Sequence, residues 1–180
     1  MKIRNDWRMS GAIVLLVFFT SACHTAGSGK TTVNDRPSVE DGGRKGRQAP
    51  KELVLQLYQA LNDTNWALAR TFVSEDFQHH YIKDTGFAPV PWSDFEKGYR
   101  MSKKAFPDWK LTPVRVVAEG DYVSVLLRGE GTHTGDFAGI PATHVKATAP
   151  IMLLHQVANG KIVADWEVSN TGLFVKQLKK

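Results

Sequence analysis

The sequence contains a single cysteine, Cys23, so no disulfide can form within the chain. A folded domain must therefore be stabilised by its apolar core and its hydrogen bonds, without covalent cross-links. The 180 residues also show no internal repeat and no apolar run as long as the roughly 20 residues that a membrane-spanning helix needs. These absences disfavour both a repeat architecture and a permanent transmembrane anchor.

The chain also lacks a concentrated basic segment. Of its 23 Lys and Arg residues and 18 Asp and Glu residues, three basic and one acidic lie within residues 1–22, which leaves 20 against 17 and a net charge of +3. This excess is small, and no stripe of basic residues alternates with aromatic ones. We therefore expect no nucleic-acid partner.

The N-terminus has the layout of a secretory signal. Basic residues precede an apolar run over residues 12–19, and small residues lead directly to Cys23. The segment resembles a bacterial lipoprotein signal, in which this cysteine is lipidated, although Thr20 stands where an aliphatic residue is usual. We expect residues 1–22 to be cleaved and Cys23 to carry a lipid that anchors the protein to the membrane of the cell envelope. A soluble secreted or periplasmic protein is the alternative.

Residues 23–49 read as a flexible tether, because they are almost all polar, Gly or Pro and show no apolar periodicity. The fragment Gly27-Ser-Gly-Lys-Thr31 suggests a phosphate-binding loop. That motif requires an earlier glycine, at the position of His24, and a preceding strand, and neither is present. A linker is the favoured interpretation.

Residues 50–180 have the length of one domain, and helices come first in it. Apolar residues at helical spacing predict a helix from Pro50 to about residue 62, and a short second helix is expected over 65–72. Residues 76–81 read as a brief strand and the Gly- and Pro-containing residues 86–91 as a loop. A capping box of Ser93 and Glu96 predicts a third helix that ends near residue 105.

Strands follow the helices. Residues 114–118 and 122–131 predict one hairpin, and residues 144–157 and 161–169 predict a second one joined by an Asn-Gly turn. Helices followed by antiparallel strands indicate an α+β domain, in which a curved sheet packs against the helices and leaves a cavity at one end.

Several segments together resemble the SnoaL-like polyketide cyclases, also called ester cyclases, over about residues 51–178. They are Phe106-Pro-Asp108, Gly131-Thr-His-Thr-Gly135, Phe137-Ala-Gly-Ile-Pro141 and Gly160-Lys-Ile-Val-x-x-Trp166. The resemblance implies a nuclear transport factor two-like fold, with N-terminal helices packed in a curved antiparallel sheet around a conical cavity. It also implies a cofactor-free and metal-free aldol reaction on a small carbonyl compound, with acid/base groups in the cavity.

One position departs from the family pattern. The family has an acid/base Asp four residues after the Trp of its last strand, and here Trp166 is followed by Asn170. An amide cannot exchange a proton at neutral pH, although it can donate a hydrogen bond to a carbonyl oxygen. The resemblance makes His80 the best remaining base, because the family often has a histidine that faces the pocket at this point. The alternative is that one of His79 and His80 packs against the helices and the other is solvated.

Strand alternation places Trp166, Val168 and Asn170 on one face of the last strand and Asp165, Glu167 and Ser169 on the other. We expect the Trp166 face to line the cavity, which would leave Asp165 and Glu167 as solvated charges unless a bulge turns one of them inward.

Gln156, together with Asn170, is a candidate for orienting a carbonyl, with an exposed amide as the alternative. Trp166, Phe106 and Tyr99 are candidates for contact with a ligand, although aromatic residues of this kind more often belong to the core. A metal site built from the chain's histidines is disfavoured, because their spacing fits no metal-binding motif. The five histidines considered are His79, His80, His133, His144 and His155.

Two functions remain open at this point. The first is an enzyme, a lipid-anchored cyclase, isomerase or hydrolase that acts on a small carbonyl compound. The second is a non-catalytic envelope module that holds an apolar ligand or a segment of a partner in the same cavity. The loss of the acid/base Asp favours the second function, and His80 permits the first. Proteins of the implied fold often form homodimers through the open face of the sheet.

Overall fold

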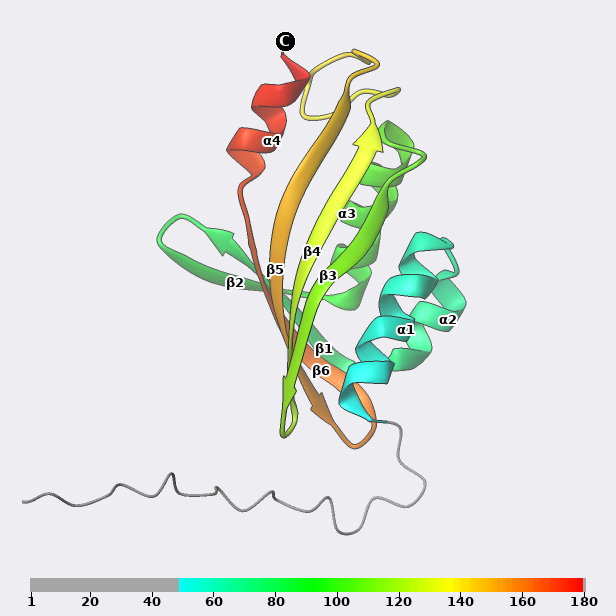
Figure 1. The fold of residues 1–180 in the computed structure, drawn as a ribbon, viewed down its shortest axis with the longest axis vertical. Coiled ribbons are helices and arrows are strands. Elements are labelled where there is room, and N and C mark those ends of the chain that lie inside the picture. Colours follow the sequence, from blue (N-terminus) through cyan, green and yellow to red (C-terminus); the bar gives the residue numbers. More distant parts are fainter. Residues whose placement is uncertain (1–48, 180) are drawn as a thin grey trace, which may run out of the picture. The chain divides into compact units, whose positions relative to one another are not determined.

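The computed structural model describes residues 49–179, which form four helices and a six-stranded sheet (Figure 1). The first half contains α1 (Pro50–Asn62), α2 (Trp66–Phe72), β1 (Val73–Lys83), β2 (Gly86–Pro91) and α3 (Trp92–Ala105). The second half contains β3 (Lys110–Glu119), β4 (Tyr122–Thr132), β5 (Lys146–Ala158), β6 (Lys161–Ser169) and α4 (Thr171–Leu178).

The strand order in the sheet is β2-β1-β6-β5-β4-β3. The predicted α+β class and the nuclear transport factor two-like arrangement are confirmed. The sheet is mixed where an antiparallel one was expected, because β6 returns from the β3–β5 meander to lie parallel to β1 while every other pair is antiparallel. This crossover brings β1 and β6, which lie far apart in the sequence, into direct contact.

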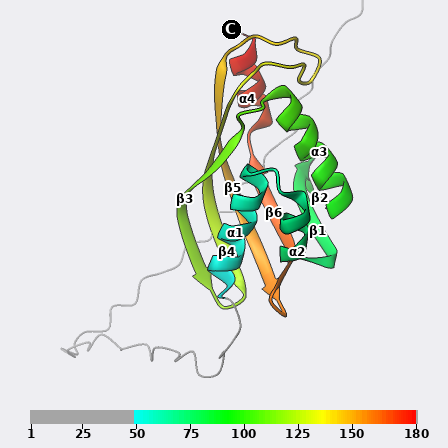
Figure 2. The ribbon, with the colours of Figure 1, turned by 90° about the vertical axis from the view of Figure 1, so that its right-hand side faces the viewer.

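The core lies between the helices and one face of the sheet. Side chains of β4 and β5 alternate almost strictly between buried and exposed, which is the pattern of strands with one covered face. Figure 2 shows α3 on one side of the bent strands β3 to β5, with α1 and α2 beside it. The apolar stripe of α1, which includes Leu53, Leu57 and Leu61, is buried as its spacing predicted.

Two local predictions differ from the structure, and one helix was not predicted. Residues 86–91, expected as a loop, form β2, because β1 supplies a neighbouring strand for their backbone groups. The capping box of Ser93 is absent: α3 starts one residue earlier and Glu96 accepts a hydrogen bond from Trp92 Nε1 at 2.8 Å. Helix α4, for which no prediction was made, begins at an N-cap provided by Asn170.

The glycines of the segment after residue 128 make room for Trp109. A Cβ atom at Gly129 would lie 2.5 Å from the Trp109 ring, and one at Gly131 would lie 3.1 Å from both Trp109 and Phe106. Asp108 closes this corner by accepting hydrogen bonds from the backbone and the hydroxyl of Thr132 at 2.7 and 2.8 Å. The motif that carried the family resemblance therefore packs one end of the core.

Candidate functional site

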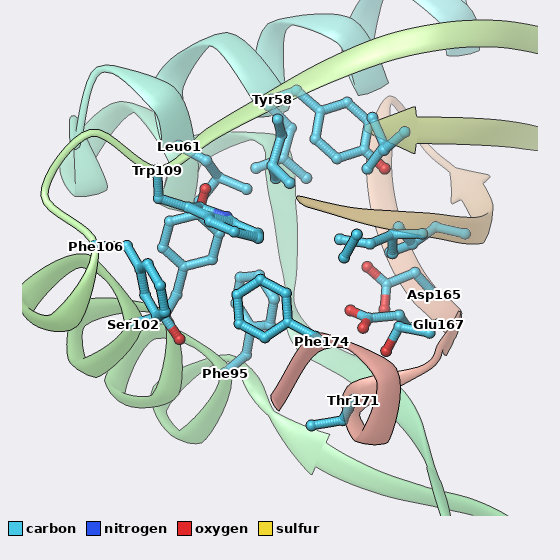
Figure 3. A pocket seen from close by; sticks show the side chains of 18 of the residues that line it. Tyr58, Leu61, Phe95, Ser102, Phe106, Trp109, Asp165, Glu167, Thr171 and Phe174 are labelled. Carbon is cyan, nitrogen blue, oxygen red and sulfur yellow. The ribbon is translucent and has the colours of Figure 1, made fainter. Parts of the chain in front are cut away.

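A cavity of about 210 Å³ lies between the helices and the inner face of the sheet (Figure 3). Its lining is mainly apolar and aromatic, with polar groups arriving from α1, α3, β5, β6 and the start of α4. An apolar cleft with a few converging polar groups is the usual form of a site for a small molecule. The apolar lining includes Leu57, Leu61, Phe95, Phe106, Trp109 and Phe174.

Two of the predicted ligand-binding residues line this cavity. Phe106 is fully buried and packs against the rings of Trp109 and Phe174. Tyr99 reaches the cavity from α3, and its hydroxyl group is buried without a hydrogen-bond partner. Burial raises the pKa of Tyr99 above its ordinary value, so the hydroxyl keeps its proton and can serve as a donor.

The prediction that His80 and Trp166 face the cavity was wrong. The two rings stack on each other, with centroids 4.9 Å apart, and neither residue lines the cavity. His80 Nδ1 also bonds to the backbone oxygen of Asp165 at 2.9 Å. The two side chains pair across β1 and β6 on the outer face of the sheet, so His80 cannot act as the base in the cavity.

Gln156 likewise does not line the cavity. It shares its strand face with Met152 and Leu154, which are 44% and 39% exposed, whereas the alternate residues of β5 are buried. The expectation that Gln156 orients a carbonyl in the cavity was wrong, because Gln156, like Trp166, lies on the outer face of the sheet. Both faces of β5 are rich in apolar residues, so hydropathy alone did not show which of them is covered.

The alternation predicted for β6 holds as far as Ser169, but its faces are reversed. Asn170, which was grouped with Trp166, follows the end of the strand and lines the cavity. Asp165 is 3% exposed and lines the cavity together with Glu167 and Ser169. Figure 3 shows the carboxylates of Asp165 and Glu167 directed from β6 toward the aromatic rings of the cavity. The expectation of a solvated carboxylate was therefore wrong for Asp165, whereas Glu167 lines the cavity and keeps 27% of its side chain exposed. No bulge is needed to turn either of them inward.

Asp165 is held between two histidines that the sequence argument did not select for the site. Its Oδ1 lies 2.7 Å from His79 Nδ1, and its Oδ2 lies 3.5 Å from His155 Nδ1. On the far side of His155, Nε2 bonds to the hydroxyl of Tyr58 at 2.5 Å. Beyond His79, Nε2 lies 4.0 Å from Glu167 Oε2. The result is a chain of ionisable groups from the core to the surface.

The two histidines respond to their surroundings in opposite ways. Burial lowers the pKa of His79, but the hydrogen bond and charge of Asp165, with the charge of Glu167, outweigh it and raise the pKa above 6.5. Burial lowers the pKa of His155 to about 4, and the Asp165 charge opposes this only in part. Burial also raises the pKa of Tyr58, so its hydroxyl donates to a neutral His155.

One signal in the sequence could have identified these residues. His79 and His155 each occupy a strand position with a buried apolar neighbour two residues away, which is Phe77 for His79 and Leu153 and Val157 for His155. A polar residue on a covered strand face needs partners, and three of them on neighbouring strands can satisfy one another. Recognising this depended on knowing that β1 and β6 are adjacent.

Asn170 lies at the rim of the cavity and caps α4. Its Oδ1 accepts a hydrogen bond from Leu173 N at 2.9 Å, which leaves the amide Nδ2 as the group that could donate to a ligand. The loss of an N-cap side chain typically costs about 1 kcal/mol. We expect Asn170→Ala to lower the free energy of unfolding by about that amount in urea denaturation.

The matched control for the cap is Asn170→Asp, because Asp is as good an N-cap as Asn. We expect it to keep the free energy of unfolding within a few tenths of a kcal/mol of the parent protein. Equal stability of Asn170→Ala and the parent would show that the hydrogen bond to Leu173 contributes nothing.

Among residues 49–179, no group of three or more His, Cys, Asp and Glu side chains is placed to hold a metal ion. Within the same residues, no helix is long and apolar enough to cross a membrane. Residues 1–48, with the expected signal, Cys23 and most of the expected tether, lie outside the described residues, so the cleavage and the lipid anchor stay predictions.

Helices packed against a bent mixed sheet, with an apolar cavity between them, define the nuclear transport factor two-like class of proteins. The sequence model of the SnoaL-like polyketide cyclases matches residues 52–178. The chain belongs to this family. No curated protein matches the chain.

Solved structures agree with the family. AclR from Streptomyces galilaeus, named as a candidate hydroxylase, is 27% identical with a TM-score of 0.64, over 73% of this chain and 96% of that one. IdmH from Streptomyces antibioticus, named as a candidate polyketide cyclase, is 24% identical with a TM-score of 0.68, over 74% and 100% of the two chains. A SnoaL-like polyketide cyclase from Agrobacterium tumefaciens is 16% identical with a TM-score of 0.60, over 74% and 99%.

Proposed function

We propose that this protein catalyses proton transfer at a carbon beside the carbonyl of a small, mainly apolar compound, without a cofactor. The observation that carries the proposal is the buried carboxylate of Asp165, which lines the apolar cavity and is held by His79 at 2.7 Å. A fixed carboxylate beside an apolar cavity is the arrangement that a general base for a carbon acid requires. Asp165 then replaces the acid/base residue that the family has at position 170.

Removal of such a proton leaves an enolate, whose negative oxygen needs a donor. Tyr99 supplies one, because its hydroxyl is buried, unpartnered and at the cavity wall. Asn170 offers a second through Nδ2, since only its Oδ1 is used in the cap. Donors that are already in place stabilise the developing charge without reorganising, and they act more strongly in an apolar cavity than in water.

The fold by itself does not choose the reaction. One similar structure is named as a candidate hydroxylase and another as a candidate polyketide cyclase, and both have the same architecture. Asn170 at the position of the family's acid/base residue supports the competing function, a binding module without turnover. The proposal therefore depends on Asp165, whose burial and hydrogen bonding to His79 fit the demands of proton transfer.

The test is deuterium uptake from heavy water beside the carbonyl of a panel of β-keto esters and cyclic ketones, followed by NMR with the full-length protein. We expect uptake above the buffer rate for ligands that fit the cavity. Ligands whose signals broaden on binding but which exchange no faster than in buffer would favour the binding module and count against catalysis.

We further propose that the protein forms a homodimer through the outer face of its sheet. Two rows of this face run across β4, β5 and β6, and neither row carries a charged side chain. A two-fold axis sets a surface against its own copy, so a neutral apolar surface can pair without like-charge repulsion. The rows are Leu126, Met152 and Val168, and Ser124, Leu154 and Trp166.

We expect sedimentation velocity in detergent to give a dimer mass for the parent protein and a monomer mass for Leu154→Lys, which places like charges at the centre of the interface. The control is Met101→Lys, at an exposed residue of α3, which should stay dimeric. A parent protein that is monomeric at every concentration would refute the dimer.

A further inference from the structure

The cavity is separated from a second, more open groove by a wall that includes His79. Asp165 lines the cavity and not the groove, whereas His79 lines the groove and not the cavity. Glu167 lines both, and 27% of its side chain is exposed. The imidazole of His79 thus lies between the cavity and a groove that is more open to solvent.

Asp165 has two histidine neighbours, His79 and His155, and only His79 connects it to a group at the groove. His155 is 1% exposed, and its other nitrogen bonds to Tyr58, which is 3% exposed and lines the same cavity, so this branch does not lead to the groove. The branch through His79 continues from Nε2 to Glu167 Oε2, 4.0 Å away at the groove. A ligand that fills the cavity would cover Asp165 from that side, which leaves His79 as its connection to water.

We propose that His79 relays protons between Asp165 in the cavity and Glu167 at the groove. This inference rests on the proposed function. Asp165 takes a proton from the carbon and becomes a neutral acid, and then passes that proton to Nδ1 of a neutral His79 that carries its own proton on Nε2. His79 releases the Nε2 proton to Glu167 or to water in the groove. The carboxylate is restored and one proton has moved from ligand to solvent. The ring is left with its proton on Nδ1, where it is donated to Asp165, and it has to regain the Nε2–H form before the next transfer.

The electrostatics favour this branch over the other. The carboxylates on both sides of His79 raise its pKa above the usual value although burial opposes them, so the ring can hold a transferred proton. Burial lowers the pKa of His155 to about 4, so that ring cannot hold a proton at neutral pH. His79 acts through Asp165 and does not need to touch the ligand.

The test compares the full-length protein with His79→Gln, which can still donate a hydrogen bond to Asp165 but cannot relay a proton, and with His79→Ala. We expect deuterium uptake to fall about a hundredfold in both, at the lower end of what a positioned acid/base group contributes. We also expect millimolar imidazole in the buffer to restore much of the uptake in His79→Ala, where it can enter the vacated space from the groove. A residue with a merely structural role would show no such rescue.

The matched control is His80→Gln, a change at the next residue of β1 but on the outer face, which should keep the parent rate. Parent-like uptake in both His79 variants would overturn the relay while leaving the proposed function intact. The same holds if uptake falls but imidazole does not restore it. Absence of uptake in the parent protein is a different result, because it removes the proposed function and the relay with it.

Discussion

Replacing Asp165 with asparagine is expected to lower catalysed deuterium uptake by about 10²- to 10⁴-fold, the usual contribution of a positioned acid/base group. The amide has nearly the shape of the carboxylate and can still hydrogen-bond to His79 Nδ1, through its oxygen or its amino group according to the tautomer of the ring. It cannot take a proton from carbon, so ligand binding should persist while exchange is lost. The measurement is NMR exchange at saturating ligand, together with the broadening of ligand signals.

The control for this variant is Asp76→Asn, which removes one negative charge from an exposed position of β1. It should exchange at the parent rate. Thermal unfolding of both variants verifies that the fold is retained. Unchanged uptake in Asp165→Asn would exclude Asp165 as the base and direct attention to Glu167, the other carboxylate of the cavity.

Lowering the pH from about 6.5 to about 4 is expected to remove roughly 3 kcal/mol from the free energy of unfolding through His155. Burial lowers the pKa of His155 to about 4 in the folded protein, against 6.5 in an exposed histidine. Between these values the unfolded chain binds a proton and the folded protein does not. Acid therefore favours unfolding, and this contribution is present above pH 6.5 and lost as the pH falls toward 4.

The contribution of His79 to the pH dependence of the free energy of unfolding has the opposite sign. Its folded pKa is raised by Asp165 and Glu167 in spite of burial, so the stability that it contributes is complete below pH 6.5 and is lost as the pH rises through the folded value. The two histidines together predict a stability maximum near pH 6.5. Both histidines face the same carboxylate of Asp165, so their two titrations are linked.

The measurement is urea denaturation between pH 4 and 8 of the parent protein and of His155→Gln, which can still bond to the Tyr58 hydroxyl but does not titrate. We expect the acid-side loss of stability in the variant to be smaller by roughly 3 kcal/mol. His80→Gln, on the outer face, should follow the parent curve. Parallel curves for the parent and His155→Gln would show that His155 is protonated in the folded state as readily as in the unfolded one.

Most of the fold could be predicted because its signals are local. The apolar spacing of α1, the Asn-Gly turn between β5 and β6, and the limits of β6 at residues 161 and 169 agree with the structure. The residues at this turn, Asn159 and Gly160, both adopt positive φ angles, which an Asn-Gly pair tolerates. Helix α4 and strand β2 escaped prediction, since one depends on a cap and the other on a neighbouring strand.

The candidate site was only half predictable. Phe106 and Tyr99, candidates because they are aromatic, and Asn170, a candidate by family resemblance, do line the cavity. His80, Trp166 and Gln156 were expected inside and lie outside, and their neighbours in sequence, His79, Asp165 and His155, take the inner positions. Each error is a shift of one residue along a strand, which moves a side chain to the opposite face.

The sequence by itself determined the class of fold, the family and the departure from the family at Asn170, because these follow from local patterns and from motifs. Only the tertiary structure decided which face of β1, β5 and β6 is covered. Alternation divides the side chains of a strand into two faces but does not show which face is covered. The large apolar ring of Trp166 suggested that its face lines the cavity, and this was wrong. The parallel pairing of β1 with β6 settles the matter, since it stacks Trp166 on His80 outside and gives the buried Asp165 a hydrogen-bond partner in His79 inside.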